Sequence, residues 1–282
     1  MKLLLSTSSK WYQMRVSFCG CFQNLAIIFN YYAAFSGGKR KRVAKMTKQE
    51  KIKFAQISVS ASWSCEEGLF SKRENVFMET EQAFFEIMTF GRNAVIRADR
   101  KIYDWCIKEF SDTPFDEIMD GENLYTLESK MREYGKKLAG EHLRFLRLNT
   151  EVSIPKPQGF TFELYGRERI LELYQDSRFE NALNYETKGE MLAIVAKTDN
   201  NIAAVVAADD YHRGFCEIGI DTLYNYRGKG LAAYLVMEIA LECEKRKAVP
   251  YYTTWSANIA SIRTALSAGF QPVWLVYFAE DI

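Results

Sequence analysis

The sequence predicts an α/β fold with a mixed sheet, in which a smaller mixed α/β domain precedes a larger C-terminal domain. From residue 160 onward, runs of strand length alternate with helical patterns. Earlier in the chain, two β-rich runs surround the turn Gly91-Arg92-Asn93. Between these regions, Pro155-Lys156-Pro157-Gln158-Gly159 interrupts both patterns, as is typical of a domain junction. We therefore expect an extension over 1–45, an N-terminal domain over 46–152 and a C-terminal domain over 153–282.

The composition is that of an ordinary folded protein. Of the 282 residues, 48% are hydrophobic and 26% are charged, which is enough for a sizeable core. The net charge is +1, so no electrostatic signature of nucleic-acid binding is present. The six cysteines lack a paired CxxC spacing and only two histidines accompany them, so we expect neither a metal site nor a disulfide framework. These features favour a reduced, cytoplasmic protein.

The first 45 residues differ from the rest of the chain. Polar side chains such as Gln23 interrupt the apolar run over 16–38, which weakens it as a membrane span, and we expect no stable membrane association. The basic run over 37–42 lies just upstream of Met46 and would be encoded by purine-rich codons. We interpret it as a translated bacterial ribosome-binding site, which makes Met46 the true start. A weak membrane anchor with a basic flank is the alternative.

The N-terminal domain is predicted to contain a hairpin and several helices. The hairpin covers 84–98, and Asp99 is expected to cap a helix that carries Ile102, Cys106 and Phe110 at helical spacing. Further predicted elements are a helix start at Thr113-Pro114, a charged amphipathic helix over 122–138 and a strand over 143–148. No catalytic spacing is present in this region, and its aromatic residues are expected in the core.

The C-terminal domain is predicted to alternate strands with helices. The predicted strands cover 160–165, 191–197, 202–209, 216–222, 251–255 and 272–278. The predicted helices cover 167–175, 230–247 and 260–268, and Pro250 is expected to stop the second of them.

The loop that joins the fourth of these strands to the long helix carries the clearest chemical signal. Its sequence is Tyr226-Arg227-Gly228-Lys229-Gly230-Leu231-Ala232. A glycine loop at a helix N-terminus offers unpaired backbone N–H groups and the positive end of the helix dipole, and both favour a pyrophosphate. The two glycines permit close backbone approach and the two basic residues add positive charge. The loop fits neither the dinucleotide pattern GxGxxG nor a P-loop.

Two motifs in this domain resemble the GNAT superfamily of N-acetyltransferases. The family's loop, roughly Q/R-x-x-G-x-G/A, corresponds to 225–230, with Asn225 in the first position. Its second hallmark is an Asn followed by a helix that ends in Gly-Phe, and here it runs from Asn258 to Gly269-Phe270. The resemblance covers about 155–282 and is closest to a bacterial group that includes zwittermicin-resistance-type acetyltransferases.

The resemblance implies a GNAT-like acyl-CoA N-acyltransferase domain that uses acetyl-CoA as co-substrate and no metal. A primary amine would attack the thioester directly, and a small-molecule amine is favoured over a protein tail as the acceptor. Backbone groups would hold the pantetheine arm and the pyrophosphate. The implied cofactor-binding residues are Ile220, Asp221, Thr222, Tyr226, Arg227, Gly228, Lys229, Gly230, Leu231, Ala232 and Asn258.

The acid–base residues are less clear from the sequence. Glu217 and Asp221 lie on one face of the fourth strand because side chains alternate along a strand, so either could accept the proton of the amine. The Tyr that the superfamily often places in the helix after the Asn is replaced here by Ala265. Tyr251, Tyr252, Tyr277 or water could then protonate the leaving thiolate. Our predicted catalytic set is Glu217, Asp221 and Tyr251.

The missing Tyr leaves a second function open, that of a non-catalytic acyl-CoA-binding regulatory protein. A further departure is that only one strand follows Gly269-Phe270, where the superfamily commonly has two. Because folded proteins avoid long bare sheet edges, we expect the hairpin of the N-terminal domain or a partner subunit to cover this edge. A homodimer is therefore an open option.

Overall fold

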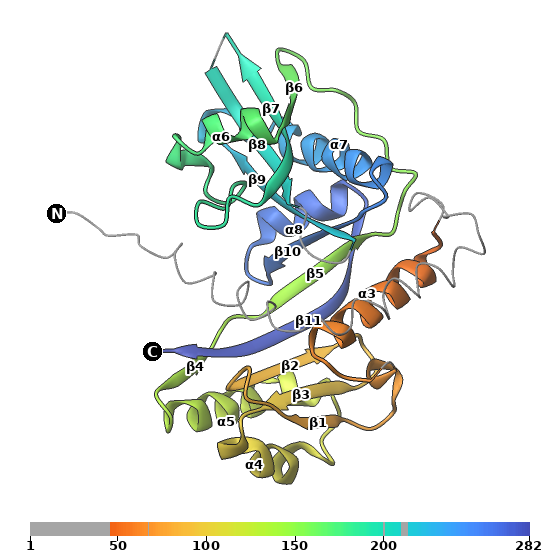
Figure 1. The fold of residues 1–282 in the computed structure, drawn as a ribbon, viewed down its shortest axis with the longest axis vertical. Helices are drawn as coiled ribbons and strands as arrows, with labels where there is room; N and C mark the ends of the chain where they lie inside the picture. The colour runs from red at the N-terminus through yellow and green to blue at the C-terminus, as the bar shows by residue number, and fades with distance from the viewer. Residues whose placement is uncertain (1–45, 67, 200, 210–213) are drawn as a thin grey trace, which may run out of the picture. The chain divides into compact units, whose positions relative to one another are not determined.

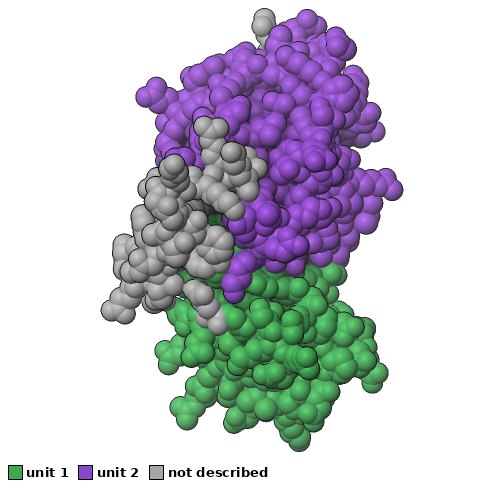
Figure 2. Space-filling view, turned by 90° about the vertical axis from the view of Figure 1, so that its right-hand side faces the viewer, with its two compact units in different colours: residues 1–34, 54–141, 274–282 green, residues 35–53, 142–273 purple. Residues whose placement is uncertain are grey.

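The structure is a computed structural model that describes residues 46–66, 68–199, 201–209 and 214–282. Our interpretation of residues 1–45 lies outside the described residues. The described chain divides into two compact units (Figure 2). Unit 1 comprises residues 54–141 and 274–282, and unit 2 comprises residues 46–53 and 142–273. The predicted domain boundary at 152/153 stays a prediction, and each unit is described by itself below.

Unit 1 is built on a hairpin and the C-terminal strand. The antiparallel hairpin of β2 (Phe85–Thr89) and β3 (Ala94–Ala98) confirms the predicted one. Strand β1 (Val76–Glu79) pairs with β3 in parallel. On the other side, β2 pairs antiparallel with the part of β11 (Phe270–Asp281) that belongs to unit 1. The prediction that this hairpin covers the last strand is therefore confirmed.

Two helices pack on one face of this hairpin (Figure 1). Helix α4 (Arg100–Phe110) begins as predicted, because the Asp99 side chain accepts a hydrogen bond of 2.9 Å from the backbone N–H of Lys101. Its residues Ile102, Cys106 and Phe110 are fully buried with alternate residues of β2 and β3, as the helical spacing predicts. Helix α5 (Gly121–Arg132) adds Leu127 and Met131 to this core.

Two predictions for unit 1 were wrong. The helix predicted over 122–138 ends at Arg132, because Gly135 adopts a left-handed φ of 69° and turns the chain into strand β4 (Lys136–Leu138), which pairs with β11. The predicted helix start at Thr113-Pro114 leads only to a 3-10 turn over Glu117–Met119. The α-helix starts later, where the Asp120 side chain accepts from the N–H of Asn123.

Unit 2 contains a six-stranded sheet in the order β5-β10-β9-β8-β7-β6. Its strands are β5 (His142–Arg147), β6 (Thr161–Gly166), β7 (Glu190–Thr198), β8 (Asn201–Asp209), β9 (Phe215–Thr222) and β10 (Val249–Trp255). All neighbours pair antiparallel except β9 and β10, which are parallel. Each strand predicted for this region is confirmed to within about two residues at its ends.

Helices cover both faces of this sheet. Helices α7 (Leu231–Lys245) and α8 (Ile259–Ser267) share one core with Cys216, Ile218 and Tyr252. Helix α6 (Arg167–Leu173) and the segment over 179–183 pack on the other face, against β7 and β8. The expectation that Pro250 stops α7 was wrong, because Pro250 lies inside β10. The helix ends earlier, at Lys245, and Lys247 then takes a left-handed φ of 66°.

A buried ionic cluster within unit 2 includes Lys51, near the start of helix α3 (Lys48–Ser62), which the sequence did not predict. The Lys51 ammonium donates to the Arg147 carbonyl at 2.8 Å and to Glu244 at 3.1 Å, and the Arg147 guanidinium donates to the other Glu244 oxygen at 3.0 Å. Burial lowers the pKa of Lys51, and the Glu244 carboxylate opposes that shift. Because each buried charge depends on the others, the start of α3 is held firmly to β5 and α7.

Among the described residues, no helix combines the length and the apolar character that a bilayer crossing requires.

Candidate functional site

Strands β9 and β10 separate partway along their length. They pair over four residues, from Phe215 opposite Val249 to Ile218 opposite Tyr252. Beyond that point, residues 219–222 pair only with β8 and residues 253–255 only with β5. The facing edges of β9 and β10 therefore carry backbone N–H and C=O groups outside the sheet's ladder. An extended ligand can satisfy such groups by adding to the edge as a further strand.

Thr222 ends β9 on this separated edge. Its hydroxyl oxygen is buried and has no hydrogen-bond partner within the described part of the chain. Buried hydroxyl groups are normally paired, so an unpaired one points to a partner that the protein chain does not supply. This residue is one of three on β9 that the sequence assigned to cofactor binding, together with Ile220 and Asp221.

The loop after β9 presents the N-terminus of α7. Gly228 and Gly230 have φ values of 74° and 72°, and an added Cβ at either residue would meet nothing within 4 Å. Glycine is required here by the left-handed backbone and not by crowding within the chain. Gly230 caps α7 without a side-chain hydrogen bond, so the first N–H groups of the helix are open to a ligand.

Basic and aromatic side chains surround this helix start. Arg227 and Lys229 are exposed, and the Arg227 Nε donates to the Thr222 carbonyl at 3.0 Å. The Lys229 ammonium lies 5.7 Å from the centre of the Tyr226 ring, which packs edge-on against Phe160. Open N–H groups and two cations at one helix start are suited to a pyrophosphate.

Asn258 starts helix α8, which packs beside α7 in the same core. The Asn258 side-chain oxygen accepts from the backbone N–H of Ser261 at 3.1 Å, so it acts as the helix cap. The residue is exposed, and it follows the end of the separated part of β10. The predicted cofactor-binding residues thus come from β9, the loop after it, and the starts of α7 and α8.

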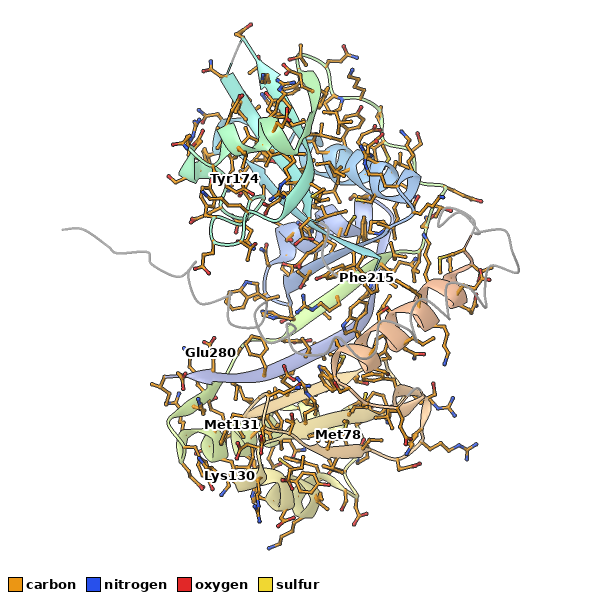
Figure 3. All side chains as sticks on the ribbon, in the orientation of Figure 1. Met78, Lys130, Met131, Tyr174, Phe215 and Glu280 are labelled. Atoms are coloured by element: carbon orange, nitrogen blue, oxygen red, sulfur yellow. The ribbon has the colours of Figure 1, made fainter. Side chains whose placement is uncertain are left out.

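The parallel register places Tyr251 directly opposite Glu217, just before the strands separate. The Tyr251 hydroxyl donates to a Glu217 carboxylate oxygen at 2.7 Å. Both residues are buried, with 8% and 9% of their surface exposed. The ring of Phe215, labelled in Figure 3 where β9 begins, packs edge-on against Tyr251 with centroids 5.5 Å apart. The sequence named both residues but not this contact, which depends on the β9–β10 register.

Asp221, the second predicted carboxylate, has a different environment. One of its oxygens accepts from the backbone N–H groups of Asn181 and Ala182, at 2.8 and 2.9 Å, and the other accepts from the Asn181 side chain at 2.8 Å. Burial raises the pKa of Asp221, while these hydrogen bonds oppose the shift. A Cβ on Gly219 would lie 2.3 Å from the Asn181 carbonyl oxygen, so the chain at 181–182 lies directly against β9. No signal in the sequence marks this contact.

The alternative tyrosines have other surroundings within their own units. Tyr252 faces the α8 side, where its hydroxyl lies 2.8 Å from the Ser261 hydroxyl, and burial raises its pKa. Tyr277 belongs to unit 1, where burial raises its pKa to about 12. Ala265, at the position where the superfamily motif often has Tyr, is fully buried in the core of unit 2. Within the described residues, no group of His, Cys, Asp and Glu side chains is arranged to hold a metal ion.

Comparisons with known structures find several similar chains. One is an acetyltransferase from the GNAT family of Colwellia psychrerythraea, with 16% identity and a TM-score of 0.39, covering 51% of this chain and 57% of that chain. Another is a GCN5-related N-acetyltransferase-like protein from Streptococcus suis, with 16% identity and a TM-score of 0.41, covering 57% and 69%. A tandem GNAT protein from the clavulanic acid biosynthesis pathway has 14% identity and a TM-score of 0.40, covering 54% and 57%. The chain thus spans little more than half the length of the first of these proteins. A comparison with curated proteins found no match.

The comparison with family models gives a direct assignment. The model described as GNAT acetyltransferase matches residues 122–274, which is more than half of the 282 residues. The match begins before residue 155, where the resemblance in the sequence starts, so it also includes α5, β4 and β5. The chain therefore belongs to the GNAT acetyltransferase family.

Proposed function

We propose that this protein is a cytoplasmic enzyme that transfers an acetyl group from acetyl-CoA to the primary amine of a small molecule by direct attack. The observation that carries the proposal is the separation of β9 from β10 beside the glycine loop and the open N-terminus of α7. Membership of the acetyltransferase family supports the same chemistry. The free thiols of Cys65, Cys106, Cys216 and Cys243 are consistent with a reducing compartment.

The residues present fit acetyl-CoA as a co-substrate. The free edge of β9 at Ile220, Asp221 and Thr222 would pair with the amide groups of the pantetheine arm. The N–H groups from Gly228 to Leu231 and the side chains of Arg227 and Lys229 would hold the pyrophosphate. The N–H groups of Tyr226 and Arg227, which the sequence prediction included, already donate to the carbonyls of Leu223 and Tyr224. The remaining members of the proposed set, Ala232 and Asn258, are at the starts of α7 and α8. Acetyl-CoA supplies an acetyl thioester, which an amine can attack without covalent help from the protein.

We assign Glu217 as the general base. Its carboxylate is fixed by the Tyr251 hydroxyl at the point where the strands separate, and it can accept the ammonium proton directly or through one water. The neutral amine then forms the C–N bond while the C–S bond breaks. The Tyr251 hydroxyl donates a proton to the leaving sulfur. The acceptor ammonium loses two protons in all: one returns to Tyr251 and the other passes to solvent. Asp221 is a positioning residue in this proposal, because three hydrogen bonds already occupy its two oxygens.

One observation favours a second function, that of a non-catalytic acyl-CoA-binding regulatory protein. The position that often holds the family's proton-donating Tyr is Ala265, and it is fully buried. In that case the loop would bind the coenzyme while amines would not be acetylated. Turnover of any amine by the purified protein would exclude this function.

Calorimetric titration of the full chain with acetyl-CoA tests the proposed site. Gly228→Asp puts a carboxylate beside the pyrophosphate, and we expect binding to weaken at least about 100-fold because like charges brought together across an interface cost several kcal/mol. Gly91→Asp is the matched control, since Gly91 also has a left-handed φ, of 84°, and nothing within 4 Å of an added Cβ. Equal weakening in both variants, or no binding by the folded wild type, would overturn the proposed site.

A further inference from the structure

A second set of side chains lies on one face of β5, β9 and β10 in unit 2. Because side chains alternate along a strand, Tyr251, Thr253 and Trp255 of β10 point to the same face. The antiparallel register sets Leu146, Arg144 and His142 of β5 opposite them, in that order. Glu217 and Asp221 share this face from β9, since the intervening Cys216, Ile218 and Ile220 contribute to the core on the α7 side. We call this set of residues the acceptor face.

On the acceptor face, Arg144 is a cation that has no carboxylate partner among the described residues. The guanidinium is half-buried and donates to the Thr253 hydroxyl at 2.7 Å. Among the residues that the structure describes, the ion pairs do not include Arg144, although most other buried or half-buried cations of unit 2 have carboxylate partners. The two carboxylates on this face are engaged elsewhere, Glu217 by Tyr251 and Asp221 by Asn181.

His142, the remaining titratable group on this face, does not change that balance. Burial and the charge of Arg144 lower the pKa of His142 to about 3, so the imidazole is neutral near pH 7. Its ring packs edge-on against Trp255, with centroids 6.3 Å apart. The Trp255 side chain remains 43% exposed, which leaves an apolar wall next to the guanidinium. A half-buried arginine held in place by a neutral hydroxyl is best satisfied by an external anion.

Resting on the proposed function, we infer that the acceptor amine also carries an anionic group, a carboxylate in the first instance, which Arg144 binds while Trp255 contacts the chain between the two ends. Thr253, which holds the guanidinium, lies two positions along β10 from Tyr251, which contacts the base. That step is ~7 Å along a strand. The same span is about two residues of extended peptide, so the acceptor has its amine and its anionic group about one dipeptide length apart.

Matched ligands of that length test the inference on the full chain. The probes are 6-aminohexanoate, its neutral amide, hexylamine and 5-aminopentyl phosphate, each offered in calorimetric binding and, with acetyl-CoA, in steady-state turnover. We expect wild-type protein to prefer 6-aminohexanoate to both neutral ligands by about 10- to 100-fold, the range set by hydrogen bonds to a charged group. Tighter binding and faster turnover of the phosphate than of the carboxylate would show that the anion is a phosphate.

Arg144→Gln keeps a donor for Thr253 but removes the charge, so we expect the preference for the acid over its amide to shrink to about two-fold or less. The control is Arg132→Gln, an exposed arginine on α5 that pairs with Glu128, and it should keep the full preference. Anion-selective binding without turnover would support the inference and overturn the proposed function. Turnover of hexylamine with no preference for either anion would support the proposed function and overturn the inference. An anion preference that persists in Arg144→Gln would overturn the role of Arg144.

Discussion

The loop before α7 and the acceptor face differ in how their chemistry is encoded. The proposed role of the loop depends on backbone geometry, since Gly228 and Gly230 hold left-handed φ values within one short stretch of chain. The proposed role of the acceptor face depends on side chains that three strands bring together, with Arg144 and Thr253 separated by 109 positions in the chain. The loop should therefore be most sensitive to changes of backbone dihedral, whereas the acceptor face should be most sensitive to changes of side chain.

The largest effect is expected at Glu217. Glu217→Gln preserves the shape and a hydrogen-bond acceptor for Tyr251 but cannot take a proton, so kcat should fall by ~10²- to 10⁴-fold. Acetyl-CoA affinity should change little, because the loop is unaltered. Steady-state kinetics and calorimetry measure the two quantities separately. Glu168→Gln, at an exposed carboxylate in the first turn of α6, is the control and should behave as wild type. Full activity in Glu217→Gln would remove this residue from the mechanism.

Two glycine substitutions, one in each region, should have effects of intermediate size on stability and activity. Gly219→Ala forces a Cβ to within 2.3 Å of the Asn181 carbonyl, so the chain at 181–182 must move away from Asp221. We expect a loss of about 1–3 kcal/mol in unfolding free energy from this overpacking, and reduced turnover. Gly228→Ala meets nothing within 4 Å and should lose only ~1–2 kcal/mol through its left-handed backbone.

Thermal unfolding, turnover and acetyl-CoA titration distinguish these two variants. Gly219→Ala should affect turnover more than coenzyme binding, and Gly228→Ala should affect coenzyme binding more than the acceptor preference. If both variants impair the same step to the same degree, the separation of the two regions is incorrect.

The smallest effect at neutral pH concerns His142, whose contribution changes only as the pH falls. Its pKa of about 3 in the folded protein lies below the unfolded value, so the unfolded chain binds more protons between these two pKa values. Unfolding free energy should therefore fall as the pH drops from ~6.5 toward 3, by at most about 1.4 kcal/mol per pH unit from this group, and be insensitive to it above that range. His142→Phe keeps a ring beside Trp255 and should flatten the profile, measured by denaturant unfolding at several pH values. Parallel profiles for the two proteins would contradict this assignment.

Local signals in the sequence predicted most of unit 2 and the hairpin of unit 1. Alternation placed Glu217 and Asp221 on one face of β9, and the isoleucines between them do contribute to a core on the other face. Asp99 marked the start of α4 because its cap is made within two residues. The same reasoning failed where pairing with a distant strand decides the secondary structure. The charged pattern of α5 continues into Lys136–Leu138, yet pairing with β11 makes this stretch a strand.

The candidate site likewise contains one part that the sequence predicts and one part that it does not. The glycine loop was predictable because its backbone geometry depends on neighbouring residues. The contacts of Glu217 with Tyr251 and of Asp221 with Asn181 were not, since they depend on the register of β9 and on a segment 40 residues away. Knowledge of the parallel β9–β10 register would have been enough to find the first contact. No signal in the sequence marks the second.

The division of β11 between the units has a consequence for synthesis on the ribosome. Unit 1 contains residues 54–141, but its sheet and strand β4 also need the part of β11 at 274–281, which is made more than 130 residues later. Until then, the outer edge of β2 has no strand beside it, and exposed edges invite incorrect pairing. Residues 142–273 are complete first. Unit 2 can therefore fold ahead of unit 1, although most of unit 1 precedes it in the chain. Chaperone binding to a nascent chain halted after residue 273 should concentrate on β2.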